Sequence, residues 1–484
     1  MTVRWENEIP IIGFGGRRCC SGQFLLGLRY SFFARTIRRS SCMPPPSLAL
    51  PTSDAKSARK TFPPVRFAHY GIVILAFAAL SNFMSGPGQT HSMGTFAGPM
   101  ATDLGLSQTT YSTAYMIATA LAALNYSLLG RIIDRHGARS LMAIGAAALG
   151  AACCLMSAVP QDFIIVLYAG MFFCRLLGQG LLSLVATWLV GEWFEKRRGL
   201  AMGIAGLGGS LSVMVTPGFS HTMIGLYGWR ETWLMLAAIL WISTVIPSLL
   251  FVRNRPEDVG LLPDLGRPGN DPDEVSVVAP VVANSEISQL NWTVAEALRT
   301  ATFWKLLAGV ASWGMIGTGL VFYQAEVLAP AGVPTHYAYW LLAIQAATAI
   351  LSSLIAGYFT GIIPARYLIC LSVCGLAAAV SLLLTMTNPW MAIPYAVMIG
   401  INGGILRSTG MVVWVNFYGR KNQGAIAGTA MSISAIASAC GPLPLALASD
   451  HFGSHQPALV IFLVIAVLAA CAVFTARPPQ KDAA

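Results

Sequence analysis

Two arginines lie deep inside long apolar stretches of the chain, where a positive charge is costly and needs a reason. Arg175 stands in the sequence CRLLGQG, and Arg407 stands in ILRSTG. No aspartate or glutamate lies at the same depth to pair with either of them. A guanidinium can donate two parallel hydrogen bonds to a carboxylate. These residues therefore predict a binding site for a small organic anion.

Three uncharged polar residues in the same kind of stretch are candidates for the rest of this site, namely Gln89, Tyr115 and Tyr323. Each also has a structural interpretation, because isolated polar side chains in membrane helices often bond to a neighbouring helix. For Arg407 the structural alternative is a side chain that reaches toward the nearer interface or bonds to helix carbonyls. The sequence leaves these alternatives open.

The composition indicates that these residues lie on membrane-spanning helices. The chain has 484 residues, of which 55% are hydrophobic and only 10% are charged. An average soluble domain carries about 25% charged residues. The mean hydropathy of +0.64 agrees with this contrast. Continuous apolar runs of roughly 20 residues favour membrane-spanning helices over the alternating pattern of a β-barrel.

Twelve apolar spans follow one another from Phe67 onward. They are predicted at residues 67–89, 108–130, 138–159, 163–190, 199–222, 229–252, 302–327, 337–360, 364–386, 389–415, 422–448 and 455–476. The expected domains are a disordered extension or mis-assigned start (1–66), a first bundle (67–252), a polar linker (253–300), a second bundle (301–476) and a tail (477–484). The sequence thus predicts an all-α polytopic membrane protein with two six-helix bundles.

Basic residues are concentrated in alternate connections between the spans. Arg131, Arg135 and Arg139 lie in one such connection, whereas the opposite connections carry essentially Arg230 alone. Because Lys and Arg are enriched in cytoplasmic loops, this asymmetry predicts that both termini are cytoplasmic. It also explains the net charge of +10 without nucleic-acid binding. We expect the plasma or inner membrane and a monomer.

The two halves of the chain are weakly repeated, as in many transporters. Three positions recur at a constant separation of 225 residues: Gly199, Gly203 and Pro217 correspond to Gly424, Gly428 and Pro442. Small residues at such spacing let helices approach closely. Gly199, Gly203 and Gly206 are therefore predicted to pack the fifth span against a neighbour, and Gly424 and Gly428 to do the same for the eleventh.

Several motifs resemble those of the major facilitator superfamily (MFS). The stretch GRIIDRHGAR, residues 130–139, is similar to the loop between the second and third helices of that family. The sequences GPGQT, EKRRGLAMGIAGLGG, GWR, RPEDVGLLPD and NFYGRKNQGAIAG resemble its monocarboxylate and oxalate/formate exchange branch. This resemblance implies a secondary transporter with alternating access, and it implies that the fifth span meets the eighth.

The resemblance also assigns roles to individual residues. It implies that Gly130, Asp134, Arg135, Gly137 and Arg139 form a conformational latch, with Asp134 holding the inner gate shut. It further implies that Arg175 organises its bundle or assists proton coupling, as an alternative to binding substrate. In one respect the chain departs from the branch: its eighth and eleventh spans carry no Lys or Arg within the bilayer.

The sequence gives no sign of an enzyme. No nucleotide-binding lysine motif, nucleophile constellation or metal-ligand spacing occurs, so neither cofactor nor metal is expected. The preferred cargo is a mono- or dicarboxylate, carried by exchange or proton symport. The alternative is efflux of neutral or cationic drug-like compounds, because the pattern around Arg175 is shared with exporters.

Overall fold

The computed structural model describes residues 70–161, 163–194, 198–261, 292–360, 362–419 and 422–479. These residues form helices joined by short turns, and no β-strand occurs among them. They belong to one compact unit, Pro64–Ala484. The predicted extension 1–66, the middle of the predicted linker and residues 480–484 lie outside the described ranges.

The first half of the described chain consists of thirteen helical segments. They are α1 (Tyr70–Met84), η2 (Gly86–Gly88), α2 (Thr90–Asp103), α3 (Gln108–Leu124), α4 (Tyr126–His136), α5 (Ala138–Ser157), α6 (Ile164–Cys174), η3 (Arg175–Leu182), α7 (Ser183–Trp193), α8 (Arg198–Tyr227), α9 (Trp229–Leu240), η4 (Trp241–Val245) and α10 (Ile246–Phe251). A single turn, η5 (Pro256–Val259), follows them.

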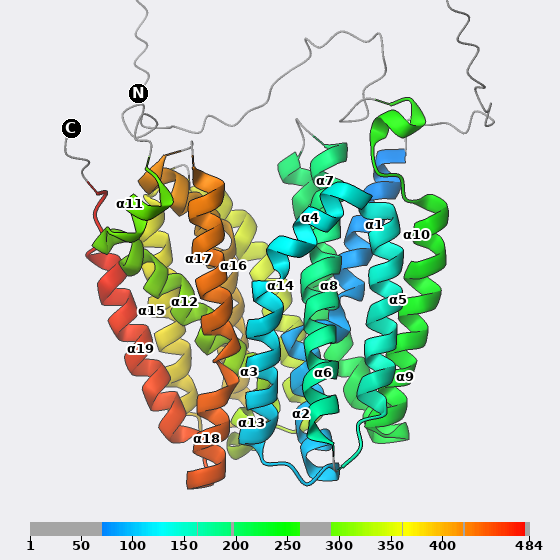
Figure 1. Ribbon diagram of the computed structural model, residues 1–484. Coiled ribbons are helices and arrows are strands. Elements are labelled where there is room, and N and C mark those ends of the chain that lie inside the picture. The colour runs from blue at the N-terminus through cyan, green and yellow to red at the C-terminus, as the bar shows by residue number, and fades with distance from the viewer. Residues whose placement is uncertain are drawn as a thin grey trace, which may run out of the picture. The chain divides into compact units, whose positions relative to one another are not determined.

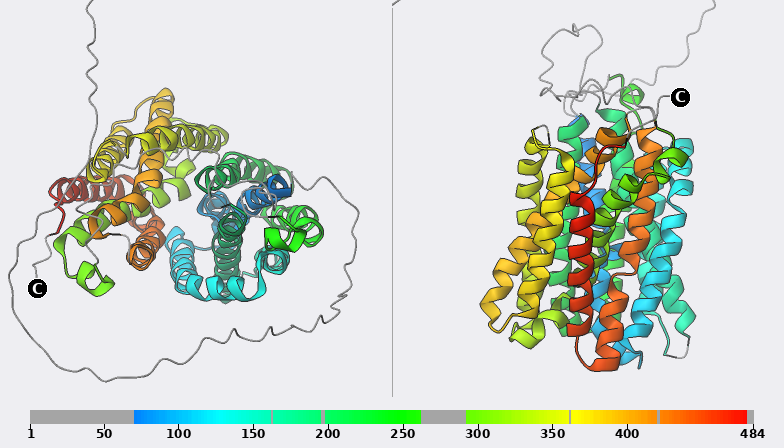
Figure 2. Two further views of the ribbon diagram at one scale, coloured as in Figure 1. Left: turned by 90° about the horizontal axis from the view of Figure 1, so that it is seen from above. Right: turned by 90° about the vertical axis from the view of Figure 1, so that its left-hand side faces the viewer.

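The helices of the second half begin inside the stretch 253–300 that was predicted as a linker. Its segments are α11 (Val294–Leu298), α12 (Ala301–Phe322), α13 (Gln324–Leu328), η8 (Ala329–Ala331), α14 (Thr335–Phe359), α15 (Ala365–Leu384), η9 (Pro389–Met391), α16 (Ala392–Tyr418), α17 (Gln423–Ala439), α18 (Pro442–Phe452) and α19 (Gln456–Phe474). Seen from above, the helices of the two halves form two neighbouring groups (Figure 2).

Eleven described helices or helix runs are long and apolar enough to cross a membrane. A twelfth span results if the bent pair Gln108–Leu124 and Leu128–His136 counts as one. The prediction of a twelve-helix, two-bundle membrane protein is therefore confirmed. The first span is longer than predicted: it runs over Tyr70–Asp103, with a break at η2 where Pro87 interrupts the helix.

Contacts between the halves involve three groups of helices (Figure 1). The long helix α8 packs along α14, α3 packs along α17 and α18, and α2 packs on α12. At the α2–α12 contact the backbones come close, because a side chain at Gly94 would collide with the backbone of Phe322. The expected pairing of the fifth span (α8) with the eighth (α14) is present.

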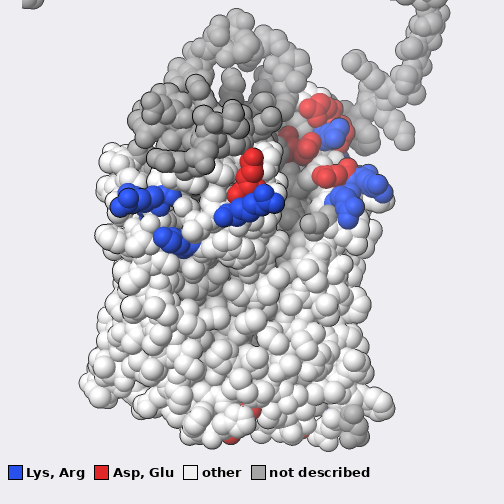
Figure 3. Space-filling model, turned by 60° about the vertical axis from the view of Figure 1, so that its left-hand side comes forward, with Lys and Arg blue, Asp and Glu red and all other residues white. Residues whose placement is uncertain are grey.

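The two ends of the bundles differ in charge. Lys and Arg gather at one end of the molecule, above a broad uncharged band (Figure 3). We call this end the basic face and the opposite end the far face. The basic face includes Arg139, Arg255 and Arg366, whereas Arg230 pairs with Asp103 at the far face, with 3.3 Å between nitrogen and oxygen.

The stretch 130–139 is mostly helix rather than the predicted loop. Residues up to His136 belong to α4, and the turn to α5 is made by Gly137 alone, with a φ of +75°. A side chain at Gly137 would also collide with Asn254. Four apolar residues, Leu128, Leu129, Ile132 and Ile133, recur at helical spacing within α4 and explain why the helix continues.

The predicted close contacts at Gly199, Gly203 and Gly206 are wrong for this conformation. A side chain at any of these positions would meet no atom within 4 Å, and the same holds for Gly428. The physical reason is that α8 and α14 meet nearer the far face, where the rings of His221 and Tyr339 lie 4.8 Å apart. Gly208, which belongs to the same run of small residues predicted for close packing, does make a close approach, to the backbone of Ala79 in α1.

The two prolines of the repeat have different surroundings. Pro217 lies inside α8 without ending it. Pro442 starts α18, after a break at Cys440 and Gly441 that divides the eleventh span. At this break Gly441 lies directly against the backbone of α12, near Met315 and Gly319.

Candidate functional site

A cavity of about 370 Å³ lies in the second half, between α12, α16 and α17. Its lining residues are Val310, Trp313, Gly403, Leu406, Arg407, Gly410, Trp414, Ala430, Met431, Ser434 and Ala435. The volume falls in the range of about 300–1,000 Å³ that is typical of small-molecule sites. The position between helices of a bundle is also typical of such sites.

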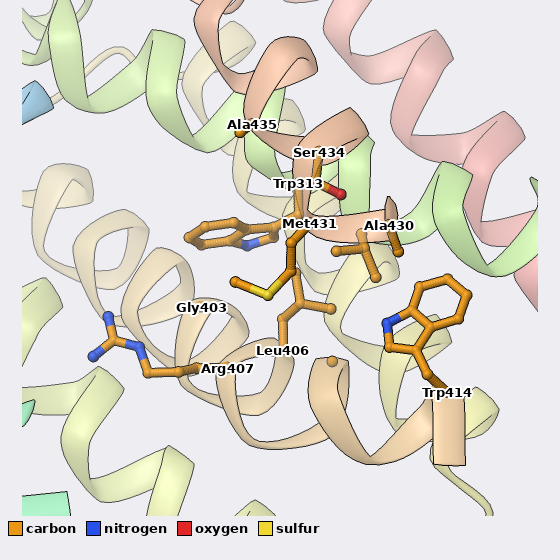
Figure 4. A pocket seen from close by; sticks show the side chains of 11 residues that line it. Trp313, Gly403, Leu406, Arg407, Trp414, Ala430, Met431, Ser434 and Ala435 are labelled. Carbon is orange, nitrogen blue, oxygen red and sulfur yellow. The ribbon is translucent and has the colours of Figure 1, made fainter. Parts of the chain in front are cut away.

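The α16 wall of the cavity follows from helical periodicity. Gly403, Arg407, Gly410 and Trp414 recur every three or four residues and therefore share one face of the helix. Arg407 and Trp414 are seven positions apart, which corresponds to about 10 Å along the helix axis. In the close view Trp313 and Met431 lie between these two ends (Figure 4).

Arg407 is the charged group of the cavity. Its side chain is exposed on α16 and extends away from the wall formed by Trp313 and Met431 (Figure 4). Within the described residues, nothing forms a hydrogen bond or an ion pair with its guanidinium. Five N–H donors are therefore available to a ligand. The structure thus brings one of the two predicted arginines to a cavity.

Two tryptophans give the cavity its aromatic walls. Trp313 lies against α16 at a point without a side chain, because a methyl group at Gly403 would lie 2.7 Å from its Cζ2 atom. Trp414 is almost fully buried and packs on Phe303, with ring centroids 5.1 Å apart. The sequence analysis did not predict a role for these two rings. The helical spacing of Gly403, Gly410 and Trp414 could have indicated that they share one face of α16.

Arg175 has a different environment from Arg407. It begins the π-helix η3, its residue is 1% exposed, and it lies outside the cavity lining. Its Nη1 atom donates a 2.9 Å hydrogen bond to the carbonyl oxygen of Gly88. Its guanidinium also lies over the ring of Tyr115, 5.0 Å from the centroid. In this conformation Arg175 joins η3 to η2 and α3, which favours the bundle-organising interpretation.

The predicted polar partners are also engaged within the protein. The Gln89 side chain donates to Ser85 Oγ at 2.9 Å, and the Tyr115 hydroxyl lies 2.8 Å from Thr90 Oγ1. Neither residue lines the cavity of the second half. In this conformation neither side chain lies at the site of Arg407. Their role as substrate ligands stays a prediction.

Tyr323 lies in the contact between the halves at the far face. Its buried hydroxyl is 2.6 Å from Ser112 Oγ on α3 and donates to the Gln108 carbonyl oxygen at 3.4 Å. Beside it, the Asp450 carboxylate of α18 accepts a 2.8 Å hydrogen bond from the backbone N–H of Thr109. Thr109 belongs to the first turn of α3, where unpaired N–H groups favour a carboxylate.

The latch residues of the predicted gate lie within the first half. Trp188 on α7 donates its indole N–H to Asp134 Oδ1 at 3.1 Å. Arg139 donates through its side chain to the Leu249 carbonyl, and its backbone N–H donates to Asn254 Oδ1. Arg135 is exposed, and Gly130 has open space beside it. Asp134 therefore contacts its own half in this conformation, and its role as a gate stays a prediction.

The site chemistry can be stated for the described part of the chain. There, no group of three or more His, Cys, Asp or Glu side chains could hold a metal ion. The cavity combines one unpaired cation with aromatic and small apolar residues. Such an arrangement can bind an anion but holds no acid–base pair for catalysis.

A multi-span protein with two six-helix halves and an open pocket between the helices of one half has the architecture of a membrane transporter. The Major Facilitator Superfamily model matches residues 76–330 and 325–484. The chain therefore belongs to the major facilitator superfamily, and its curated relatives are transporters rather than enzymes.

Relatives of known activity fall into several transport classes. A riboflavin transporter of Trypanosoma cruzi is 28% identical over 38% of this chain and 39% of its own length. Monocarboxylate transporter 2 of Homo sapiens is 26% identical over 29% of this chain and 30% of that protein. The fujikurins efflux protein of Gibberella fujikuroi is 26% identical over 77% of this chain and 74% of that protein. The matches to the first two cover well under half of those transporters.

Solved structures show the same fold. A bacterial homologue of the human lysosomal transporter Spinster, in an inward-facing and occupied conformation, superposes with a TM-score of 0.63 at 16% identity. The match covers 86% of this chain and 99% of that chain. The unoccupied form of that homologue gives a TM-score of 0.62 at 17% identity.

Proposed function

We propose that this transporter carries a small organic anion by alternating access and that Arg407 binds the carboxylate of the anion. The observation that carries the proposal is the unpaired guanidinium of Arg407 at the cavity. A guanidinium without a partner in the protein keeps its N–H donors available, and a carboxylate can accept two of them at once. With no acid in the lining, a substrate carboxylate supplies the missing charge.

The conformation supports alternating access as the mechanism. Hydrogen bonds between the halves gather at the far face, at Asp450 with Thr109 and at Tyr323 with Ser112 and Gln108. The glycines at the basic end of α8 have open space beside them instead. A rocking motion that parts the far-face contacts and brings these glycines against α14 would present the cavity to the other side.

The distribution of charge supports an orientation. We infer that the basic face is cytoplasmic, that both termini lie on that side, and that the protein resides in the plasma or inner membrane, acting as a monomer. Lys and Arg close to membrane spans are enriched on the cytoplasmic side. In this orientation the described conformation is closed toward the outside.

The alternative cargo is a neutral or cationic compound that leaves the cell. The fungal efflux relative, which matches most of the chain, favours it. The lining argues against a cation, because it contains Arg407 and neither Asp nor Glu.

Uptake by the full-length protein in liposomes separates these functions. Labelled monocarboxylates, dicarboxylates and a lipophilic cation are compared, with protein-free liposomes as the control. We expect saturable uptake of a carboxylate that unlabelled carboxylates inhibit. Saturable uptake of the cation alone would contradict the proposal.

A further inference from the structure

The cavity has only one positive charge, and this limits the charge of its ligand. Among the eleven lining residues, Arg407 is the single ionisable side chain, and Arg175 is buried in the other half against Gly88. A second carboxylate on the ligand would face apolar groups. Burying a carboxylate without a partner carries a large free-energy cost. The lining therefore fits a monoanion better than a dicarboxylate.

The remaining walls fit an apolar body of some width. Val310, Leu406 and Met431 contribute aliphatic and thioether groups, and Trp313 and Trp414 contribute ring faces and edges. Met431 is 56% exposed, so its flexible side chain is free to contact a ligand. A ligand as small as acetate would reach Arg407 but leave these groups without contact.

Open space continues along α16 beyond Arg407. A side chain at Gly410, one helical turn further on, would meet no atom within 4 Å. Gly403, one turn before Arg407, is instead covered by the Trp313 indole. The lining of the cavity therefore runs along α16 from Arg407 past Gly410 to Trp414, about 10 Å along the helix.

Two polar atoms at the wall lack partners in the described residues, namely Trp313 Nε1 and Ser434 Oγ. Buried donors without an acceptor are rare in proteins and often mark a place that a ligand or water completes. Both side chains belong to the cavity lining. A hydroxyl or carbonyl oxygen on the apolar body would satisfy the indole N–H after a small movement of the ring.

We infer that the substrate is an aromatic monocarboxylate whose carboxylate binds Arg407 after the exposed guanidinium turns toward the cavity, and whose flat apolar body lies along Trp313 and Met431 toward Gly410. This inference rests on the proposed function and makes it narrower. Arg407 supplies the positive charge that the carboxylate of the ligand needs. Side chains of α12 and α17 supply the apolar surface that its body needs.

Binding to the purified full-length protein tests the inference with defined probes. Phenylacetate and indole-3-acetate are the aromatic monoanions, acetate and succinate the aliphatic acids, and phenylacetamide the uncharged aromatic control. We expect both aromatic acids to bind at least about tenfold more tightly than acetate, since aromatic contacts and buried apolar area add affinity. Succinate should bind no better than acetate.

Substitutions locate the body of the ligand. Trp313→Ala should weaken binding of indole-3-acetate about tenfold while Trp313→Phe retains most of it. Gly410→Leu should fill the open space and weaken indole-3-acetate more than acetate. Trp390→Ala, at a 75% exposed tryptophan of η9 outside the cavity, is the matched control and should bind like the unmodified protein.

The outcomes separate this inference from the proposed function. If acetate and succinate bind as tightly as indole-3-acetate, the aromatic body is wrong while anion transport stands. If phenylacetamide binds as tightly as phenylacetate, Arg407 contributes no charge selectivity and the proposed function fails. If Gly410→Leu weakens all acids equally, the body does not extend toward Trp414, and the inference is overturned.

Discussion

Arg175 and Arg407 occupy the fourth span of the first and of the second half, respectively, yet their surroundings are opposite. Arg175 is enclosed, bonded to the Gly88 carbonyl and stacked on Tyr115. Arg407 is exposed at a cavity and lacks a partner among the described residues. The same residue type in pseudo-equivalent spans therefore serves two purposes. One arginine joins helices of its own half, and the other is available to a ligand.

The helix around each arginine explains the difference. In the first half the span changes from α6 to the π-helix η3 at Arg175, and Gly178 lets η3 touch the backbone of Gly88. In the second half α16 is a continuous helix of 27 residues, and Gly410 leaves space beside Arg407. π-Helical turns interrupt the regular spacing and often occur at sites under special constraint.

The largest expected effect comes from removing the enclosed charge. Arg175→Gln should lower the free energy of unfolding by about 2–3 kcal/mol, because the Gly88 carbonyl loses a charged donor in a buried place. Thermal unfolding in detergent measures this change. Arg407→Gln is the matched control and should unfold near the temperature of the unmodified protein. Equal destabilisation by both substitutions would remove the contrast between the two arginines.

A pair of glycine substitutions compares the packing of the two regions. Gly178→Ala places a methyl group 2.8–2.9 Å from backbone atoms of Gly88 and Ser85, and should destabilise the protein by about 1–3 kcal/mol. Gly410→Ala meets open space and should be neutral or slightly stabilising, because alanine favours helix. Unfolding temperatures of the two variants decide the matter. A Gly178→Ala variant as stable as the unmodified protein would show that the backbone around Gly88 and Ser85 can move to accommodate a methyl group.

The far-face contact offers a smaller effect. Asp450→Asn should weaken the bond to the Thr109 N–H by about 1 kcal/mol, the value of a typical helix cap. Hydrogen–deuterium exchange at residues 107–112 should become faster as the halves part more often. Arg131→Gln, at an exposed residue of α4, serves as the control and should leave this exchange unchanged. If Asp450→Asn has no effect on exchange, that carboxylate does not hold the far face closed.

The smallest expected effect belongs to Asp134 itself. In the described conformation it bonds to Trp188 of its own half, so Asp134→Asn should leave ligand affinity intact. If the residue holds the basic face shut in the opposite conformation, turnover in liposomes should fall several-fold. Arg131→Gln, at an exposed residue of the same helix, is the control. Unchanged turnover of Asp134→Asn would leave it a surface residue with a local hydrogen bond.

Composition and periodicity predicted the spans and the two halves, and the family resemblance implied the pairing of α8 with α14. They also placed Arg407 among the candidate ligands. The sequence did not distinguish Arg407 from Arg175, because both are lone arginines in apolar helices. Which side of a helix is buried depends on the helices packed against it. The backbone contact between Gly88 and Gly178 produces no periodic pattern in the sequence.

Two further features depended on three-dimensional context. Gly199, Gly203 and Gly206 do not pack closely against a neighbouring helix in this conformation. Small residues permit two helices to approach each other but do not force them to. The cap that Asp450 forms on α3 joins residues 341 positions apart, a relation that a pattern search along the chain does not detect. Local patterns predicted elements, and long-range contacts decided which residues meet.

The most direct measurement is a titration of the purified full-length protein and its Arg407→Gln variant with a radiolabelled aromatic monocarboxylate. We expect the variant to fold, with an unfolding temperature like that of the unmodified protein. We also expect its affinity to fall about 10- to 100-fold, because a hydrogen bond to a charged group is lost. Equal saturation curves for the two proteins would show that Arg407 does not bind the substrate carboxylate.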